Sequence, residues 1–182
     1  MQRAIGMVEL NSIAKGIYTA DQMVKISEVE IVTATTSCPG KYIIIVTGDV
    51  AAVEDSVRTG EHFAEEFFVD SIVIPNVEPS VFPAIAGATM PERIQAIGIM
   101  ESFSLATMII CADQIMKAGE LEAIEMRLGN GIGGKAYFTY TGDVAAVKSG
   151  TEAGLKVAEE KGLLVNAEVI PSPSDLVIPS LL

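Results

Sequence analysis

The chain contains one sequence pattern twice in tandem. The matching segments are residues 4–30 with 96–122, 41–66 with 135–160, and 71–85 with 167–181. Within them the heptapeptide TGDVAAV occurs twice without a mismatch, beginning at Thr47 and at Thr141. A duplication of this extent predicts two similar domains, at 1–88 and 89–182, joined by a Gly-, Thr- and Pro-containing linker at about 86–95.

Each copy predicts the element order βαββαβ. In the first copy, β-branched and apolar runs predict strands, while Asn11 or Ser12, and later Asp49, are suited to cap helices. The expected strands are residues 4–10, 29–36, 41–47 and 71–75, and the expected helices run to about Ser27 and about Phe68. This order is typical of an antiparallel sheet with both helices on one face, an α+β domain of the ferredoxin-like class or a relative of it.

The first helix is expected to bury one apolar face. Its apolar residues that recur at helical spacing are Ile13, Ile17, Ala20 and Val24. We therefore expect these four side chains to lie in the core of the first domain.

Composition excludes several classes of function. The 24 acidic and 12 basic residues give a formal net charge of −12, which opposes binding to nucleic acid. Hydrophobic residues make up 49% of the chain but aromatic residues only 5%, which favours a compact core of small side chains. No apolar run is long enough to span a membrane, and the segment MQRAIGMVEL lacks the features of a secretory signal. With only two cysteines, the chain is expected to be a cytoplasmic protein with reduced thiols.

The sequence GNGIGG at 129–134 matches the dinucleotide-binding pattern G-x-G-x-x-G. A dinucleotide site requires these glycines between a strand and the N-terminus of a helix, where the backbone amides meet the pyrophosphate. Here the strand-like run KAYFTYT follows instead, and the next helix is expected only after Gly142. We therefore interpret the motif as a glycine-rich connection between two strands.

No constellation of catalytic residues emerges from the pattern. The single histidine, His62, is expected on the surface of the second helix, and no serine or cysteine nucleophile occupies a strand–helix elbow. The acid pairs Glu65–Glu66 and Glu159–Glu160 are expected on the solvated faces of equivalent helices. These observations predict that the protein is not an enzyme.

The two cysteines occupy different kinds of position. Cys111 lies in an apolar helix and is expected to be a small buried thiol. Cys38 lies in the interstrand turn SCPG, which Pro39 stiffens and in which Gly40 permits a bend. Cys38 could be an incidental loop cysteine. If three chains met around an axis at this loop, three thiolates would converge, one fewer than the four usual for an iron–sulfur cluster.

Several motifs that occur in both copies resemble the bacterial microcompartment shell domain. They are A-I-G-x-x-E at 4–9 and 96–101, A-D-Q-M-x-K at 20–25 with its counterpart at 112–117, T-G-D-V-A-A-V, and V-I-P. Two copies in one chain are similar to the tandem-domain shell proteins, in which three chains form a pseudo-hexameric ring. The resemblance implies a structural tile that packs edge to edge with other shell proteins around an enzyme-filled interior.

A narrower resemblance links the chain to the PduT-like iron–sulfur subgroup of propanediol-utilising and related compartments. It is carried by S-I-A-K-G at 12–16, C-P-G-K at 38–41, P-S-V-x-P-A-I at 79–85 and G-I-G-G-K at 131–135. The resemblance implies a homotrimer in which Cys38 of each chain ligates one [4Fe–4S] cluster in the central pore, for electron transfer across the shell or cluster delivery. An enclosed redox enzyme is then a candidate partner. The implied pore loop comprises Ser37, Pro39 and Gly40 in the first copy, and Gly131, Ile132 and Gly133 in the second.

The resemblance also suggests which residues make lateral contacts between tiles. Lys25 and Lys117 match the edge lysine of the family. Many shell domains carry an arginine after the proline that ends the last strand, but Asn76 and Ser172 stand there in this chain. The two lysines are therefore the candidates for lateral shell contacts.

Two alternatives remain open at this point. The protein could be a shell pore without a cluster that passes small metabolites, and iron content would separate that function from the first. It could also be a ligand-binding regulatory module, because ferredoxin-like repeats often bind small molecules between domains. Such a module would form a discrete oligomer that never assembles into sheets.

Overall fold

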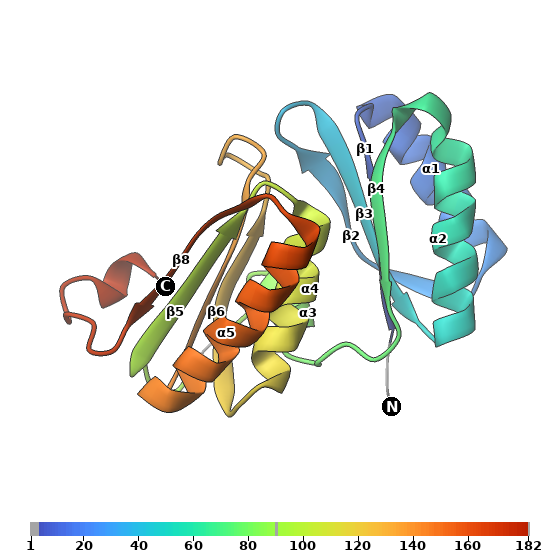
Figure 1. Ribbon diagram of the computed structural model, residues 1–182. Coiled ribbons are helices and arrows are strands. Elements are labelled where there is room, and N and C mark those ends of the chain that lie inside the picture. The colour runs from blue at the N-terminus through green and yellow to red at the C-terminus, as the bar shows by residue number, and fades with distance from the viewer. Residues whose placement is uncertain (1–3, 90, 182) are drawn as a thin grey trace. The chain divides into compact units, whose positions relative to one another are not determined.

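A computed structural model describes residues 4–89 and 91–181 (Figure 1). The chain divides into two compact units, Met1–Val77 and Glu78–Leu182. Residues 78–88, which the sequence analysis places in the first domain, belong to the second unit in the structure. The two units repeat one architecture, so each is described by itself.

The first unit is a four-stranded antiparallel sheet with two helices. Its elements are β1 (Ala4–Leu10), α1 (Ile13–Ile26), β2 (Val29–Ser37), β3 (Lys41–Gly48), α2 (Val50–Ala64), the 3-10 turn η1 (Glu65–Phe67) and β4 (Phe68–Ile74). The strand order is β2-β3-β1-β4, with β1 in the middle of the sheet between β3 and β4. Both helices lie on one face of the sheet (Figure 1). The predicted βαββαβ order and α+β class are confirmed.

The second unit repeats the same sheet, with order β6-β7-β5-β8. Its elements are the short helix α3 (Val81–Ile85), β5 (Ala96–Ser102), α4 (Leu105–Lys117), β6 (Leu121–Leu128), β7 (Ala136–Gly142), α5 (Val144–Lys161), β8 (Leu164–Ile170) and the 3-10 turn η2 (Ile178–Ser180). The sequence analysis did not predict α3, which precedes β5 and packs against α4 and β6. Among the described residues, no helix combines the length and the apolar character needed to cross a membrane.

The core of the first unit lies between the sheet and its two helices. The buried residues of α1 are Met23 and three smaller ones, Gly16, Thr19 and Ala20. A Cβ atom at Gly16 would lie 2.5 Å from the Cβ of Tyr42, so the absence of a side chain lets α1 approach β3 closely. The predicted apolar face was therefore wrong in part. Ala20 is buried and Val24 half-buried, but Ile13 and Ile17 are exposed, because Gly16, Ala20 and Met23 occupy the buried face of the helix instead.

The second helix of the first unit ends earlier than the pattern indicates. We expected it to reach about Phe68, but α2 ends at Ala64, and Glu65 adopts a left-handed φ of 51°. An L-residue in that conformation interrupts α-helical hydrogen bonding. Phe68 then pairs with Leu10 in the sheet, so β4 begins at Phe68 rather than at Ser71.

Candidate pore hairpins

Cys38 lies at the tip of the hairpin that joins β2 to β3. The strands pair up to Ser37 and Lys41, which leaves Cys38, Pro39 and Gly40 as the turn. Cys38 is half-buried, and Pro39 and Gly40 are exposed. Gly40 has a φ of +73°, a conformation that favours glycine. The chain thus presents one thiol on a tight, ordered turn.

The glycine-rich motif forms the equivalent hairpin between β6 and β7. The N–H of Gly129 donates to the carbonyl of Lys135 at 2.8 Å and closes the loop. Gly131 and Gly133 have φ values of +75° and +67° and are exposed, and Ile132 is half-buried between them. Strand β7 follows directly, which agrees with the interpretation as an interstrand connection and not with a nucleotide site.

A carboxylate–lysine pair lies at the base of each hairpin. Lys41 Nζ is 2.8 Å from Glu9 Oε1, and the carboxylate of Glu9 is almost fully buried. Lys135 Nζ is 2.5 Å from Glu101 Oε1 in the second unit, where both side chains are more exposed. Sequence reasoning missed these pairs. Their signal was the recurrence of a glutamate in the central strand and a lysine after the turn in both copies.

The donor chemistry of the first hairpin suits an iron–sulfur cluster shared between chains. A cysteine thiolate is the usual ligand of such clusters, and one chain supplies one thiolate at this turn. Within the described residues of a single chain, no group of three His, Cys, Asp or Glu side chains could hold a metal ion. Beside Cys38, the buried hydroxyl of Ser37 has no hydrogen-bond partner among the described residues. A cluster at this turn would therefore need thiolates from several copies.

The remaining candidate residues lie away from the hairpins. Cys111 is fully buried on α4, and burial raises the pKa of its thiol to about 12. Its Sγ lies 3.4 Å from the carbonyl oxygen of Gly154, so the thiol donates a weak hydrogen bond. His62 is exposed on α2, and both acid pairs lie on exposed surface. These placements agree with the structural roles that the sequence analysis assigned, except that Glu65 and Glu66 lie in the 3-10 turn η1 after α2, whereas Glu159 and Glu160 lie in the helix α5.

The two candidate edge lysines each pair with an aspartate one turn earlier on the same helix. Lys25 Nζ lies 2.5 Å from Asp21 Oδ2, and both side chains are largely exposed. Lys117 Nζ lies 2.7 Å from Asp113 Oδ2, but this carboxylate is buried. The same motif therefore occupies two different environments in the two units.

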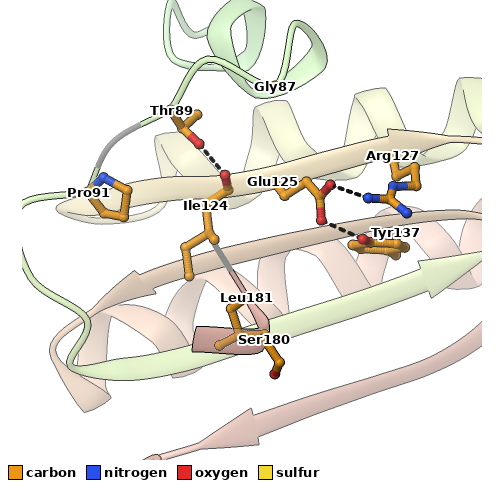
Figure 2. Close-up of a pocket in the computed structure, with 9 residues that line it drawn as sticks. All are labelled: Gly87, Thr89, Pro91, Ile124, Glu125, Arg127, Tyr137, Ser180 and Leu181. Carbon is orange, nitrogen blue, oxygen red and sulfur yellow. Dashed lines mark hydrogen bonds and ion pairs between the residues drawn. The ribbon is translucent and has the colours of Figure 1, made fainter. Parts of the chain in front are cut away.

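A pocket of about 530 Å³ opens over β6 and β7 in the second unit (Figure 2). One oxygen of Glu125 accepts from the guanidinium group of Arg127 at 2.8 Å, and the other accepts from the hydroxyl of Tyr137. Burial, and then the hydrogen bond to Glu125, raises the pKa of Tyr137 to about 12. Because both carboxylate oxygens are already paired, the cluster is a self-contained polar network, and Tyr137 stays protonated at neutral pH.

The comparisons with known proteins agree with this architecture. The model of the BMC domain matches residues 4–77 and 96–173, one match in each unit. The chain is 42% identical over 175 residues to the bacterial microcompartment shell protein PduT of Citrobacter freundii, covering 96% of this chain and 95% of PduT. It is 30% identical to the carboxysome assembly protein CcmO of Synechocystis sp., over 92% of this chain and 61% of CcmO.

Solved structures show the same likeness. The crystal structure of a microcompartments protein from Desulfitobacterium hafniense DCB has a TM-score of 0.94 and 47% identity, covering 98% of this chain and 99% of that chain. The present chain, with a BMC-domain match in each unit, belongs to the BMC-domain family. It is a PduT-like tandem shell protein of bacterial microcompartments, a family of structural rather than catalytic proteins.

Proposed function

We propose that three copies of the chain form a pseudo-hexameric shell tile whose central pore holds one [4Fe–4S] cluster. The observation that carries this proposal is the position of Cys38 at the tip of a hairpin whose counterpart in the second unit, residues 129–135, contains no cysteine. Three copies would bring six hairpins to the pore, and every second one would carry a thiol. The 42% identity to PduT over nearly the whole chain supports the same arrangement.

The trimer itself is supported by a difference between the two units. Ile13 and Ile17 on α1 are exposed, with 56% of Ile17 accessible, whereas the aligned Leu105 and Ile109 on α4 are buried. Exposed isoleucines on one face of a helix are characteristic of a surface that becomes buried on association. A second copy of the chain is the occupant we propose for this face.

In such a tile the residues of the hairpin have distinct roles. Cys38 would supply the thiolate, and Pro39 and Gly40 would hold the turn that aims it. Three thiolates leave one iron for water, a small ligand or a partner, and a bound cluster supplies one-electron chemistry. Lys41 is three residues after Cys38 in the sequence, but its positive charge is already paired with the carboxylate of Glu9. Electron transfer across the shell, or delivery of the cluster to an enclosed redox enzyme, would follow from this exposed position.

Iron content tests the proposal directly. The protein would be purified without oxygen, and iron and acid-labile sulfide measured per chain alongside the native mass. We expect a trimer with about four irons per three chains, the content of one four-iron cluster. Cys38→Ser should remove the iron and keep the trimer. Cys111→Ala, the matched control, should keep both.

Other outcomes would change the assignment. A trimer without iron, even after anaerobic reconstitution, would make the protein a pore for small metabolites. Iron that survives Cys38→Ser would contradict the proposed ligand. Loss of the trimer in Cys38→Ser would make Cys38 a structural residue.

Lateral packing of the tiles is a separate part of the proposal. Proteins of this family assemble with other shell proteins, and we propose that Lys25 and Lys117 lie at the tile edge. Electron microscopy of concentrated protein should show flat sheets, and Lys25→Glu should reduce them without dissolving the trimer. Complete absence of sheets in the unaltered protein would favour a discrete regulatory module.

A further inference from the structure

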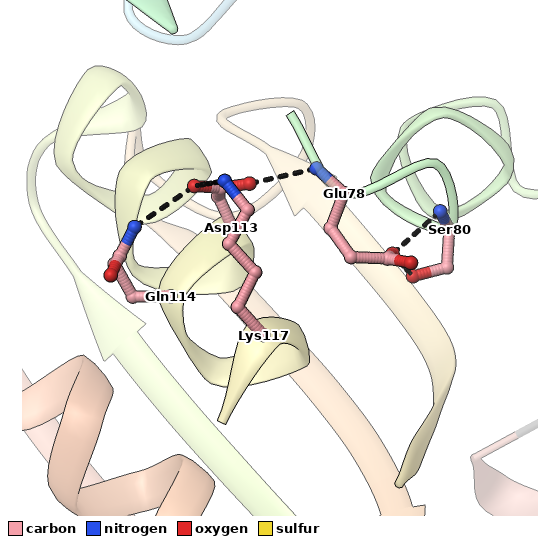
Figure 3. Close-up of polar contacts among 5 residues, drawn as sticks. All are labelled: Glu78, Ser80, Asp113, Gln114 and Lys117. Atoms are coloured by element: carbon pink, nitrogen blue, oxygen red, sulfur yellow. Dashed lines mark hydrogen bonds and ion pairs between the residues drawn. The ribbon is translucent and has the colours of Figure 1, made fainter. Parts of the chain in front are cut away.

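The connecting segment, residues 78–85, closes over one end of α4 in the second unit. The backbone N–H of Glu78 donates to Oδ1 of Asp113 at 2.8 Å, and Asp113 is only 1% exposed (Figure 3). The other carboxylate oxygen accepts from the side chains of Gln114 and Lys117. Val81, in α3 of the same segment, is fully buried. The segment thus satisfies a buried carboxylate and buries an apolar side chain.

The first unit carries the same acceptor without the donor. Asp21 aligns with Asp113, and its Oδ2 accepts from Gln22 at 3.0 Å and from Lys25 at 2.5 Å, as in the second unit. Its Oδ1 has no hydrogen-bond donor among the described residues, and the side chain is 49% exposed. Two units with the same Asp-Gln-x-x-Lys arrangement therefore differ in what covers the aspartate.

Strand β2, next to α1, shows the same difference. Ile31 is exposed, whereas the aligned Ala123 in β6 is buried. In the second unit, Ser80 and Pro83 of the connecting segment line one pocket together with residues 121–123, so the segment lies beside this part of β6. The corresponding part of β2 presents an uncovered apolar side chain.

The segment that aligns with the connecting segment, residues 174–181, begins with the same turn, although it continues as the 3-10 turn η2 where the connecting segment forms α3. The N–H of Val177 donates to the carbonyl of Ser174 at 2.8 Å, as the N–H of Val81 donates to that of Glu78 at 3.1 Å. The side chain of the first residue also accepts a hydrogen bond within this turn, since the N–H of Leu176 donates to Ser174 Oγ at 3.3 Å. The corresponding bond in the connecting segment joins Ser80 N–H to Glu78 at 2.7 Å.

The apolar side chains of this shared turn differ in exposure between the two segments. Val81 is fully buried, but the aligned Val177 is 45% exposed and Leu176 is 91% exposed. The turn is ordered by its own hydrogen bonds and nevertheless leaves two large apolar side chains accessible. Such a preformed apolar segment loses little conformational entropy on binding.

We infer that residues 174–181 bind α1 and β2 of the first unit in a second copy of this chain, with the N–H of Ser174 donating to Oδ1 of Asp21. The inference rests on the proposed trimer and names a segment that joins its members. Each copy has one such segment and one such surface, so the contact is heterologous, and three copies can close a ring. Val177 of one copy then covers the apolar surface beside Ile31 of the next.

Cross-linking between tagged chains tests this contact. Two full-length chains in a Cys38→Ser background, one with Asp21→Cys and one with Ser174→Cys, would be co-expressed with different tags and oxidised with copper phenanthroline. A gel without reductant should show a linked pair of the two tags, at least tenfold more abundant than with Asp55→Cys in place of Asp21→Cys. Asp55 is an exposed residue of α2 and serves as the matched control.

A single substitution provides a second readout. Val177→Asp should raise the concentration at which half of the trimer dissociates by at least tenfold. Because Val177 is exposed in a single copy, the same change should leave the unfolding temperature of the dissociated chain within error of the original.

The outcomes separate this inference from the proposed function. Trimers that form while the linked pair stays at the control level, or while Val177→Asp has no effect, would overturn the inference alone. A linked pair in the Cys38→Ser background, together with the absence of iron from trimers of the unaltered protein, would overturn the cluster alone. A chain that stays monomeric by native mass spectrometry would overturn both.

Discussion

The thiol of Cys111 is fully buried on α4, beside the carbonyl of Gly154, while Cys38 lies half-exposed at a hairpin tip. Burial disfavours the thiolate and raises the pKa of Cys111 to about 12, so this side chain stays protonated at pH 8. The sequence predicted both surroundings, because Cys111 follows two isoleucines in a helix whereas Cys38 precedes a proline in a turn. It did not reveal the hydrogen bond of Cys111, which depends on how closely α5 packs.

Alkylation should distinguish the two thiols in the cluster-free protein. Because only the thiolate reacts readily and Cys111 is both protonated and buried, we expect iodoacetamide at pH 8 to modify Cys38 at least tenfold faster. Peptide mass spectrometry at several times would give the two rates. Denatured protein is the control, in which the rates should become similar. Equal rates in the folded protein would contradict the burial of Cys111.

The two lysine–glutamate pairs should contribute unequally to stability. Lys41→Met leaves the nearly buried carboxylate of Glu9 without its partner, which should cost about 3 kcal/mol of unfolding free energy. Lys135→Met is the matched variant, and its cost should stay below about 1 kcal/mol because Glu101 remains accessible to water. Urea unfolding at fixed protein concentration would measure both. Equal costs would show that Glu9 is solvated in solution.

At the scale of whole elements, most of each domain could be predicted because strand and helix patterns are local. The errors arose where tertiary packing decides. Helical spacing identifies the apolar residues of α1, but it cannot tell a face that packs in the core from one that meets a partner. In the structure, Gly16 packs against Tyr42 on the core face of α1, and Ile17 lies on the exposed face. The end of α2 likewise depends on Phe68 joining the sheet, a long-range pairing.

The two identical heptapeptides TGDVAAV each lead into a helix, and the two helices are capped differently. Asp143 accepts from the N–H of Ala146 at 2.8 Å, whereas Asp49 makes no such side-chain bond to its helix. Asp143→Ala should therefore cost about 1 kcal/mol of unfolding free energy, the usual loss on removing a helix cap. Asp49→Ala, the matched variant, should cost only a few tenths of a kcal/mol of unfolding free energy, roughly. Thermal unfolding of the two variants would compare them, and a reversed order would contradict the observed caps.

At the scale of the whole molecule, the candidate site could be predicted only in part. One chain shows where Cys38 lies, but the chemistry of a shared pore depends on symmetry, which local patterns do not encode. The repeat supports the symmetry that we propose. In the trimer that we propose, aligned positions with different exposure mark the surfaces that a second copy covers. The formal net charge of −12 on each copy opposes the association that we propose, so the apolar contacts would have to outweigh this repulsion.

Two aligned isoleucines should therefore behave in opposite ways when made charged. Ile17→Asp places a carboxylate on an exposed face of α1, so the chain should fold normally but lose the trimer at concentrations at which the original protein is fully associated. Ile109→Asp places the same group in a fully buried position of α4, where an unpaired charge should prevent stable folding. Circular dichroism would report folding, and native mass spectrometry would report assembly. If Ile17→Asp still formed trimers, the exposed face of α1 would not be an interface, and the ring would have to close through another surface.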